Sequence, residues 1–172
     1  MTALRVLLGG LGVRGRHWAE VLQRSPRTEI AAYADPNPAA IERMAAQYGA
    51  RPAFPSVEAA LDALPGIDAI VLANPPIGRI GQVTAAAKRG LPLLIEKPLA
   101  LELDEAAELV NIAETAAIPL MVGLNFRYLG VTKESLRLLA DGTVGRAEFA
   151  RFTYERYRDG NRPDLNKYPL TM

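Results

Sequence analysis

A glycine-rich segment near the amino terminus has residue types and spacing that suit phosphate binding. It follows an apolar run and reads Gly10-Leu11-Gly12-Val13-Arg14-Gly15. The first glycine permits a tight turn, the second lets the backbone approach a pyrophosphate, and the third lets a helix pack close to its strand. The pyrophosphate would lie on free N–H groups at the N-terminus of that helix. The alternative is a glycine-rich turn without function.

An acidic residue follows this turn at the distance where dinucleotide-binding units place one. Asp35 ends the next apolar run, about 20 residues after Gly15. A carboxylate there accepts hydrogen bonds from the adenosine ribose hydroxyls and repels a 2′-phosphate. The sequence therefore predicts NAD as cofactor, with NADP as an alternative because Arg14 or Arg16 could reach a phosphate.

A lysine is predicted at the end of a later buried strand, within the segment Leu-Ile-Glu96-Lys97-Pro98. Ligands bind at this edge of a doubly wound sheet. There an ammonium can hydrogen-bond a substrate hydroxyl or carbonyl, and a lysine of lowered pKa can accept a hydroxyl proton during hydride transfer. A cis bond between Lys97 and Pro98 is expected to aim the lysine inward. The alternative is a solvated lysine beside a turn-forming proline.

Short apolar runs alternate with amphipathic stretches, and they predict the elements that position these residues. Strands are predicted over 4–8, 29–34, 68–73, 91–95 and 119–122, with helices over 13–23, 39–48, 57–64, 77–87 and 104–117. The first helix is expected to bury Trp18, Val21 and Leu22 on one face. This order is typical of βαβ units and predicts an α/β fold with a Rossmann-type, doubly wound parallel sheet.

The pattern changes after Gly123. A helix is predicted over 132–140, and an alternating stretch from Arg146 to Arg158 is amphipathic on both faces, which favours an antiparallel strand. We therefore expect a Rossmann domain over residues 1–123. Residues 124–172 are expected to begin a second, α+β domain with a mainly antiparallel sheet.

Several motifs occur together, in order and at fitting spacing. They are Gly10-x-Gly12-x-x-Gly15, Asp35, Asn74-Pro75-Pro76, Glu96-Lys97-Pro98-Leu99-Ala100 and Asn125-Phe126-Arg127-Tyr128. In this combination the chain resembles the glucose–fructose oxidoreductase / inositol dehydrogenase family, called Gfo/Idh/MocA. The resemblance implies a first domain that binds NAD(P), and a second domain that supplies substrate contacts and subunit interfaces, hence a homo-oligomer.

The resemblance also implies roles for single residues. Lys97 carries over as the catalytic lysine. The residues implied to contact the cofactor beyond the glycine turn and Asp35 are Asn74, Pro75, Pro76, Glu96 and Lys97. Asn125 and Arg127 are implied at the substrate side of the active site.

The chain departs from the family pattern in two respects. Arg79 occupies the position where the family often has a histidine. Family members are also considerably longer and carry a second catalytic motif, with Asp and His, in the later domain. We therefore expect that this chain is not a self-sufficient enzyme: either further chain follows in the native protein, or the stretch from Arg146 to Arg158 pairs with another subunit.

The composition narrows the class of protein. With 20 basic and 19 acidic residues, the chain lacks the basic excess of proteins that bind nucleic acids or membrane surfaces. It has no cysteine, and His17 is its only histidine, so neither a thiol nucleophile nor a multi-histidine metal site is expected. No apolar stretch approaches the roughly 20 residues that span a bilayer. A cytoplasmic location is expected.

The leading hypothesis is an NAD(P)-dependent oxidoreductase that acts on a secondary alcohol of a sugar, polyol or related small molecule. One alternative is a non-catalytic dinucleotide-binding module, or a partner subunit, that lacks the second catalytic motif. A methyltransferase ranks last, because the Glu96-Lys97-Pro98 segment has no role in that chemistry.

Overall fold

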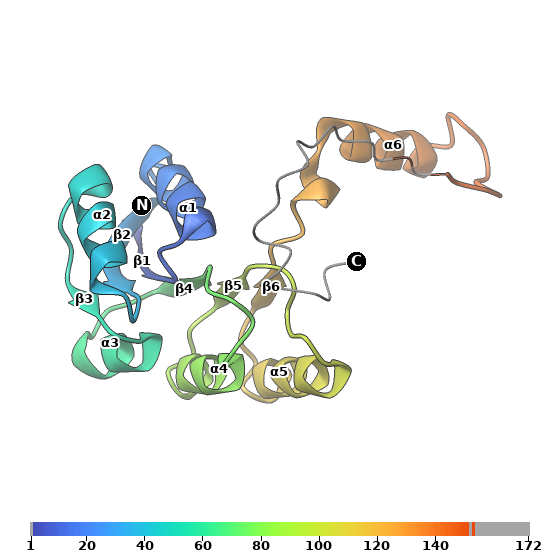
Figure 1. Cartoon of the computed structure of the whole chain (residues 1–172). Coiled ribbons are helices and arrows are strands. Elements are labelled where there is room, and N and C mark those ends of the chain that lie inside the picture. Colours follow the sequence, from blue (N-terminus) through green and yellow to red (C-terminus); the bar gives the residue numbers. More distant parts are fainter. Residues whose placement is uncertain (1, 152, 154–172) are drawn as a thin grey trace, which may run out of the picture. The chain divides into compact units, whose positions relative to one another are not determined.

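The first unit of the chain is a Rossmann fold. The computed structural model describes residues 2–151 and Thr153, and the chain divides into two compact units, Met1–Leu124 and Asn125–Met172. The sheet of the first unit consists of β1 (Leu4–Gly9), β2 (Thr28–Ala34), β3 (Ala53–Phe54), β4 (Ala69–Leu72), β5 (Leu93–Ile95) and β6 (Leu120–Val122). The spatial order β3-β2-β1-β4-β5-β6 confirms the predicted doubly wound sheet (Figure 1).

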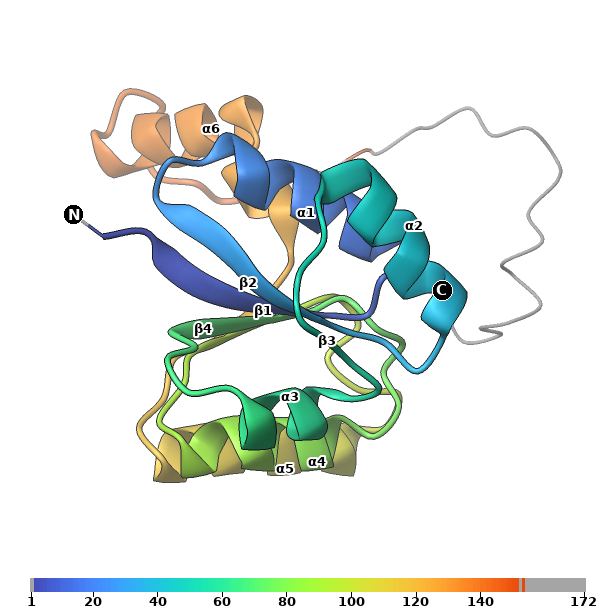
Figure 2. The same ribbon diagram turned by 90° about the vertical axis from the view of Figure 1, so that its left-hand side faces the viewer.

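Helices cover both faces of this sheet. They are α1 (Val13–Arg24), α2 (Pro38–Tyr48), α3 (Val57–Ala63), α4 (Arg79–Lys88) and α5 (Leu103–Thr115). Helices α1 and α2 lie on one face, and α3, α4 and α5 lie on the other (Figure 2). Side chains of β1 alternate between the two faces of the sheet: Val6 and Leu8 pack on the α1–α2 side, whereas Leu7 packs on the opposite side.

The two ends of the strands form two distinct edges of the sheet. Every strand pair is parallel, so the carboxyl ends of all six strands meet at one edge. The order reverses between β1 and β4, and ligands of doubly wound sheets bind outside the carboxyl ends at such a switch point. The segments that follow β1, β4 and β5 are those that carry the predicted site residues.

Helix α1 presents a different face to the sheet from the one predicted. Its buried residues are Gly15, Ala19 and Leu22, whereas Val21 is 55% exposed. The prediction that Val21 is buried was therefore wrong. Small residues at positions 15 and 19 allow the helix axis to approach the sheet, and the large side chains flank that contact.

The described part of the second unit contains the 3₁₀ helix η1 (Asn125–Tyr128) and the helix α6 (Gly130–Ala140). The predicted antiparallel strand is not confirmed. Residues 146–151 and Thr153 carry no strand, and the remainder of the predicted strand, Phe152 and residues 154–158, lies outside the described residues. A strand is held by hydrogen bonds to a neighbouring strand, and no neighbour is present in the described part of this unit.

No helix within the described ranges combines the length and the apolar character that crossing a membrane requires.

Candidate functional site

The glycine turn between β1 and α1 has the geometry expected from its sequence. Gly10 has φ +83°, and a Cβ at this position would overlap the backbone N of Asn74. A Cβ at Gly15 would overlap the carbonyl O of Gly10. Gly12 is different, because no atom of the described residues lies within 4 Å of the place of its Cβ. The first and third glycines are thus required by the fold, whereas the second leaves open space beside the backbone.

The N-terminus of α1 is not satisfied by the chain's own side chains. Gly12 is its N-cap, without a side-chain hydrogen bond, and its first turn contains no acidic residue. In contrast, Asn37 caps α2 and Ser56 caps α3, each by accepting a backbone N–H. Free N–H groups and the positive end of the helix dipole make the N-terminus of α1 suited to an anion.

Asp35 lies immediately after β2 and is held beside the glycine turn. Its Oδ2 accepts the backbone N–H of Leu11 at 2.7 Å, and its Oδ1 accepts that of Asn37 at 2.8 Å. Because each carboxylate oxygen has two lone pairs, both oxygens keep the capacity to accept a further hydrogen bond. The structure thus brings Asp35 to the turn, with a carboxylate in a fixed orientation.

Glu96 connects the end of β5 to α1. Its carboxylate is buried, and its Oε1 accepts hydrogen bonds from the Arg14 guanidinium and from Trp18 Nε1, the latter at 2.9 Å. Its Oε2 is buried and has no hydrogen-bond partner among the described residues. The Arg14 guanidinium is therefore paired with Glu96. In the alternative considered above, the same guanidinium would reach toward a 2′-phosphate.

Lys97 follows Glu96 at the carboxyl edge and is exposed. The preceding backbone is fixed, because the N–H of Glu96 donates to the carbonyl of Leu72 on β4 at 2.8 Å. The Lys97–Pro98 peptide bond is cis, as expected. The lysine thus stands on a fixed segment of backbone while its side chain is accessible to a bound molecule.

The Asn74-Pro75-Pro76 segment follows β4 at the same edge. Asn74 Nδ2 donates to Gln82 Oε1 on α4 at 3.2 Å, whereas the buried Oδ1 of Asn74 has no hydrogen-bond partner in the described part of the chain. Pro76 is buried and Pro75 is exposed. Two buried acceptors without donors, one on Asn74 and one on Glu96, therefore follow neighbouring strands.

Sequence reasoning gave no role to Arg79, whose side chain is the largest that is fully buried in the described residues. Its guanidinium donates to the carbonyls of Asn74, Pro98 and Leu99. Burial lowers the pKa of Arg79 to about 10, against the opposing effect of the Glu105 and Glu96 carboxylates. An arginine between the apolar residues Ile77 and Ile80 is the sequence signal that could have pointed to this residue.

Asn125 and Arg127, the two residues implied to contact substrate, lie on η1 in the second unit. Both are exposed, and the Arg127 guanidinium lies 5.7 Å from the ring centroid of Tyr128. Their role toward a substrate remains a prediction.

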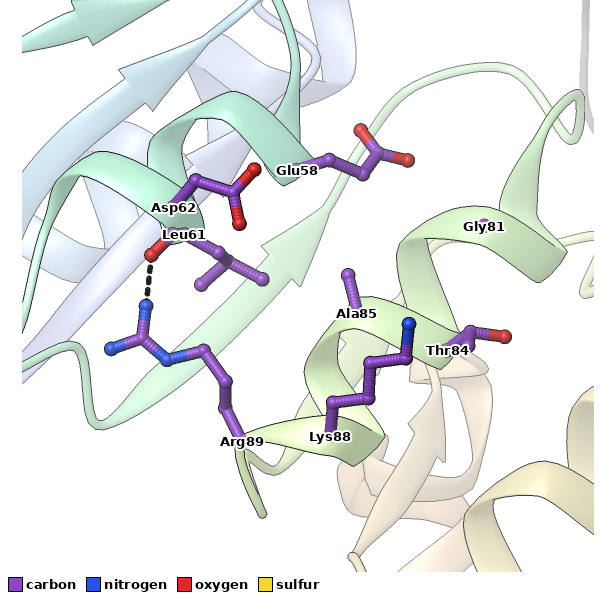
Figure 3. Close-up of a pocket in the computed structure, with 8 residues that line it drawn as sticks. All are labelled: Glu58, Leu61, Asp62, Gly81, Thr84, Ala85, Lys88 and Arg89. Carbon is purple, nitrogen blue, oxygen red and sulfur yellow. Dashed lines mark hydrogen bonds between the residues drawn. The ribbon is translucent and has the colours of Figure 1, made fainter.

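A separate groove of about 400 Å³ lies between α3 and α4 (Figure 3). Its charged lining consists of Glu58 and Asp62 on α3, with Lys88 and Arg89 at the end of α4. Arg89 donates to the carbonyls of Leu61 and Leu64, which joins the two helices. None of the predicted site residues lines this groove.

Comparison with known proteins agrees with this geometry. Residues 4–124, well over half of the chain, match GFO_IDH_MocA, described as "Oxidoreductase family, NAD-binding Rossmann fold". The chain belongs to this family. The predicted membership of the Gfo/Idh/MocA family and the Rossmann fold are thereby confirmed.

Relatives within the Gfo/Idh/MocA family include sugar and polyol dehydrogenases. The inositol 2-dehydrogenase of Rhizobium meliloti is 27% identical over 95% of this chain and 48% of its own length. The D-xylose 1-dehydrogenase (NADP(+)) 2 of Haloferax volcanii is 33% identical over 78% of this chain and 41% of its own length. The chain thus spans about half, or somewhat less, of the length of these relatives.

A solved structure shows the same arrangement of elements. An oxidoreductase from Agrobacterium radiobacter, crystallised in complex with NAD+, L-tartaric acid and magnesium, superposes with a TM-score of 0.79 at 27% identity. The match covers 84% of this chain and 42% of that protein. The similarity therefore extends over most of this chain.

Proposed function

We propose that this chain forms the cofactor-binding part of a dehydrogenase that transfers hydride between NAD and a secondary alcohol or carbonyl of a sugar or polyol. The observation that carries the proposal is the convergence, at one sheet edge, of the glycine turn, Asp35, Lys97 and the unpaired acceptors of Asn74 and Glu96. The names of the relatives, among them inositol 2-dehydrogenase and D-apiose dehydrogenase, support this substrate class.

The residues at this edge fit a nicotinamide dinucleotide. The open space beside Gly12 and the uncapped N-terminus of α1 suit a pyrophosphate. Asp35 suits the hydroxyls of the adenosine ribose. The buried Oδ1 of Asn74 and Oε2 of Glu96 require hydrogen-bond donors. Amide N–H and ribose O–H groups at the nicotinamide end are donors of the kind they require.

Lys97 is the acid–base group of the proposed reaction. NAD, held by the glycine turn and Asp35, would supply the hydride acceptor for the substrate carbon. Lys97 takes the proton of the substrate hydroxyl during oxidation, and in the reverse direction it returns this proton to the carbonyl oxygen. The fixed backbone before Lys97 and the exposed side chain agree with a group that holds and moves this proton.

NAD is the proposed cofactor in preference to NADP. The carboxylate of Asp35 repels a 2′-phosphate, and Arg14, which could otherwise compensate this charge, is paired with Glu96. Arg16, in the first turn of α1, is the remaining basic residue near the turn. One relative carries NADP in its name, so the two cofactors are to be compared directly.

The second unit is proposed to supply substrate contacts, through Asn125 and Arg127, and a subunit interface. Apolar side chains on α6 support the second role, because Val131 is 72% exposed and Leu136 is 59% exposed. Sedimentation velocity should find an oligomer, and replacing both side chains by Ser should shift it toward the monomer. A wild-type monomer would contradict the interface.

The proposed function is tested by calorimetric titration with NADH and NADPH, followed by assays of NAD+ reduction by polyols and aldoses in the full-length protein. NADH should bind more tightly than NADPH, and a polyol or an aldose should be oxidised. Binding without turnover would favour the non-catalytic alternative, and the absence of binding would contradict the cofactor site.

A further inference from the structure

Arg79 joins the two segments that carry the proposed nicotinamide site. It is the first residue of α4 and follows Gly78, whose backbone is left-handed (φ 70°, ψ 17°). One Nη donates to the carbonyl of Asn74 at 3.0 Å, and the other donates to the carbonyls of Pro98 and Leu99, to Leu99 at 2.7 Å. The first carbonyl follows β4 and the other two follow β5, so one guanidinium spans two adjacent strand ends.

Lys97 is thereby held on both sides. Before it, the N–H of Glu96 bonds to the carbonyl of Leu72, and the Glu96 carboxylate bonds to Arg14 and Trp18. After it, the carbonyls of Pro98 and Leu99 are bound by Arg79. Among the described residues, these two carbonyls are linked to the Asn74 segment through this guanidinium alone.

The cost of this arrangement indicates a role beyond filling space. The Arg79 side chain is fully buried, its guanidinium donates to neutral carbonyls, and its Nε has no partner among the described residues. A buried charge without a direct carboxylate partner is expensive, and an apolar side chain of similar volume is often no less stabilising. A planar fork with several donors is, however, the side chain that can bind three converging carbonyls.

We propose that Arg79 is a positioning residue for Lys97: it fixes the Lys97–Leu99 segment against the Asn74 segment and so sets where the lysine amine meets the nicotinamide end of the cofactor. This inference rests on the proposed function. Arg79 itself contacts neither substrate nor cofactor in this account.

Arg89 provides a matched control at the other end of the same helix. It also donates to two backbone carbonyls, those of Leu61 and Leu64, but it joins α3 to α4 away from the predicted site residues. Arg89→Met therefore removes the same kind of contact from the same helix. It should leave Lys97 and the cofactor unaffected.

The test follows the Lys97 amine directly, by NMR of the protein after ¹³C-methylation of its lysines, with Lys97→Arg to assign the signal. In the wild type, NADH should shift the Lys97 signal. In Arg79→Met, the signal should move in the free protein. NADH should also bind about tenfold more weakly, because the Asn74 segment, which carries an unpaired acceptor for the nicotinamide end, loses its hydrogen bond to Arg79. In Arg89→Met, the signal should stay in place and the affinity should change by less than about twofold.

Each outcome separates the two hypotheses. If NADH does not affect the Lys97 signal of the wild type, the proposed function fails. If it does, but Arg79→Met leaves both the signal and the affinity unchanged, Arg79 is structural and the inference is overturned. Should Arg79→Met not fold, Arg79→Lys decides: it keeps the charge without the planar fork, so a displaced signal supports positioning and an unchanged signal contradicts it.

Discussion

An aspartate accepts a backbone N–H near each end of β1, and the surroundings of the two aspartates differ. At the amino edge, Asp68 accepts the backbone N–H of Arg5 at 2.8 Å, and the Arg5 guanidinium donates to the carbonyl of Gly66 at 2.7 Å. At the carboxyl edge, Asp35 accepts the N–H of Leu11 at 2.7 Å. The two aspartates thus make nearly the same bond, Asp68 to a residue of β1 and Asp35 to the turn that follows β1.

The difference lies in the buried polar atoms nearby. In the described residues, the buried side-chain N and O atoms without a partner are Asn74 Oδ1, Arg79 Nε and Glu96 Oε2. All three belong to residues at or next to the carboxyl edge, whereas Arg5 and Asp68 at the amino edge are exposed to solvent. Because buried polar groups are normally paired, the unpaired ones gathered at the carboxyl edge indicate that a ligand binds there.

The largest expected effect concerns Lys97 at the carboxyl edge. Lys97→Ala should lower turnover of the full-length enzyme by about 10²- to 10⁴-fold, because an acid–base group is lost, while NADH affinity changes little. Steady-state kinetics and a binding titration measure the two quantities. Near-normal turnover would show that Lys97 is a solvated lysine beside a proline and not the acid–base group.

The next effect concerns the open space beside Gly12. Its φ of −72° suits any residue, and no protein atom opposes a Cβ. Gly12→Ala should therefore keep the thermal stability but weaken NADH binding by about tenfold or more, because the methyl group occupies the path of the pyrophosphate. Gly130→Ala is the control, since its Cβ also meets no atom. Equal affinity of both variants would place the pyrophosphate elsewhere.

A smaller effect compares the two aspartates. Asp35→Asn and Asp68→Asn should each lower the free energy of unfolding by about 1 kcal/mol, because each weakens a hydrogen bond from a backbone N–H to a charged acceptor. Only Asp35→Asn should reduce the preference for NADH over NADPH, since it removes the charge that repels the 2′-phosphate. A change of preference in Asp68→Asn would contradict the division between the edges.

The smallest effect is expected in the groove between α3 and α4. Lys88 is exposed and has no ion-pair partner among the described residues, so Lys88→Ala should change the free energy of unfolding by less than about 0.5 kcal/mol. Urea unfolding and an NADH titration check both points. A large loss of NADH affinity would show that the groove takes part in cofactor binding, which is not expected.

The sequence predicted five of the six strands of the described sheet, because each of the five is an apolar run; β3, with two residues, is too short to give such a signal and was not predicted as a strand. Local signals also mark the ends of helices. Asn37 and Gly49 mark the two ends of α2, for example. The buried face of α1 was predicted less well. Its contact depends on the small residues Gly15 and Ala19, which carry little hydrophobic signal, and so the exposed Val21 was misplaced.

The site was predictable where residue type determines the role, as for the glycine turn, Asp35 and Lys97. The partners of Arg14 and Arg79 were not, because they depend on contacts between residues far apart in sequence. Arg14 pairs with Glu96, and Arg79 binds carbonyls of Pro98 and Leu99, which no local pattern encodes. Carbonyl acceptors in particular leave no trace in the sequence, since every residue has one.

The central claim is that the carboxyl edge, and not the amino edge, binds a nicotinamide dinucleotide. The most direct measurement is an NMR titration of the backbone amides with NADH. We predict shifts of the amide signals of Gly10–Gly15, Asp35, Asn74 and Glu96–Lys97. The amide signals of Arg5, Gly66 and Asp68 should stay unchanged. Shifts confined to the amino edge or to the groove between α3 and α4, or no shifts at saturating NADH, would contradict it.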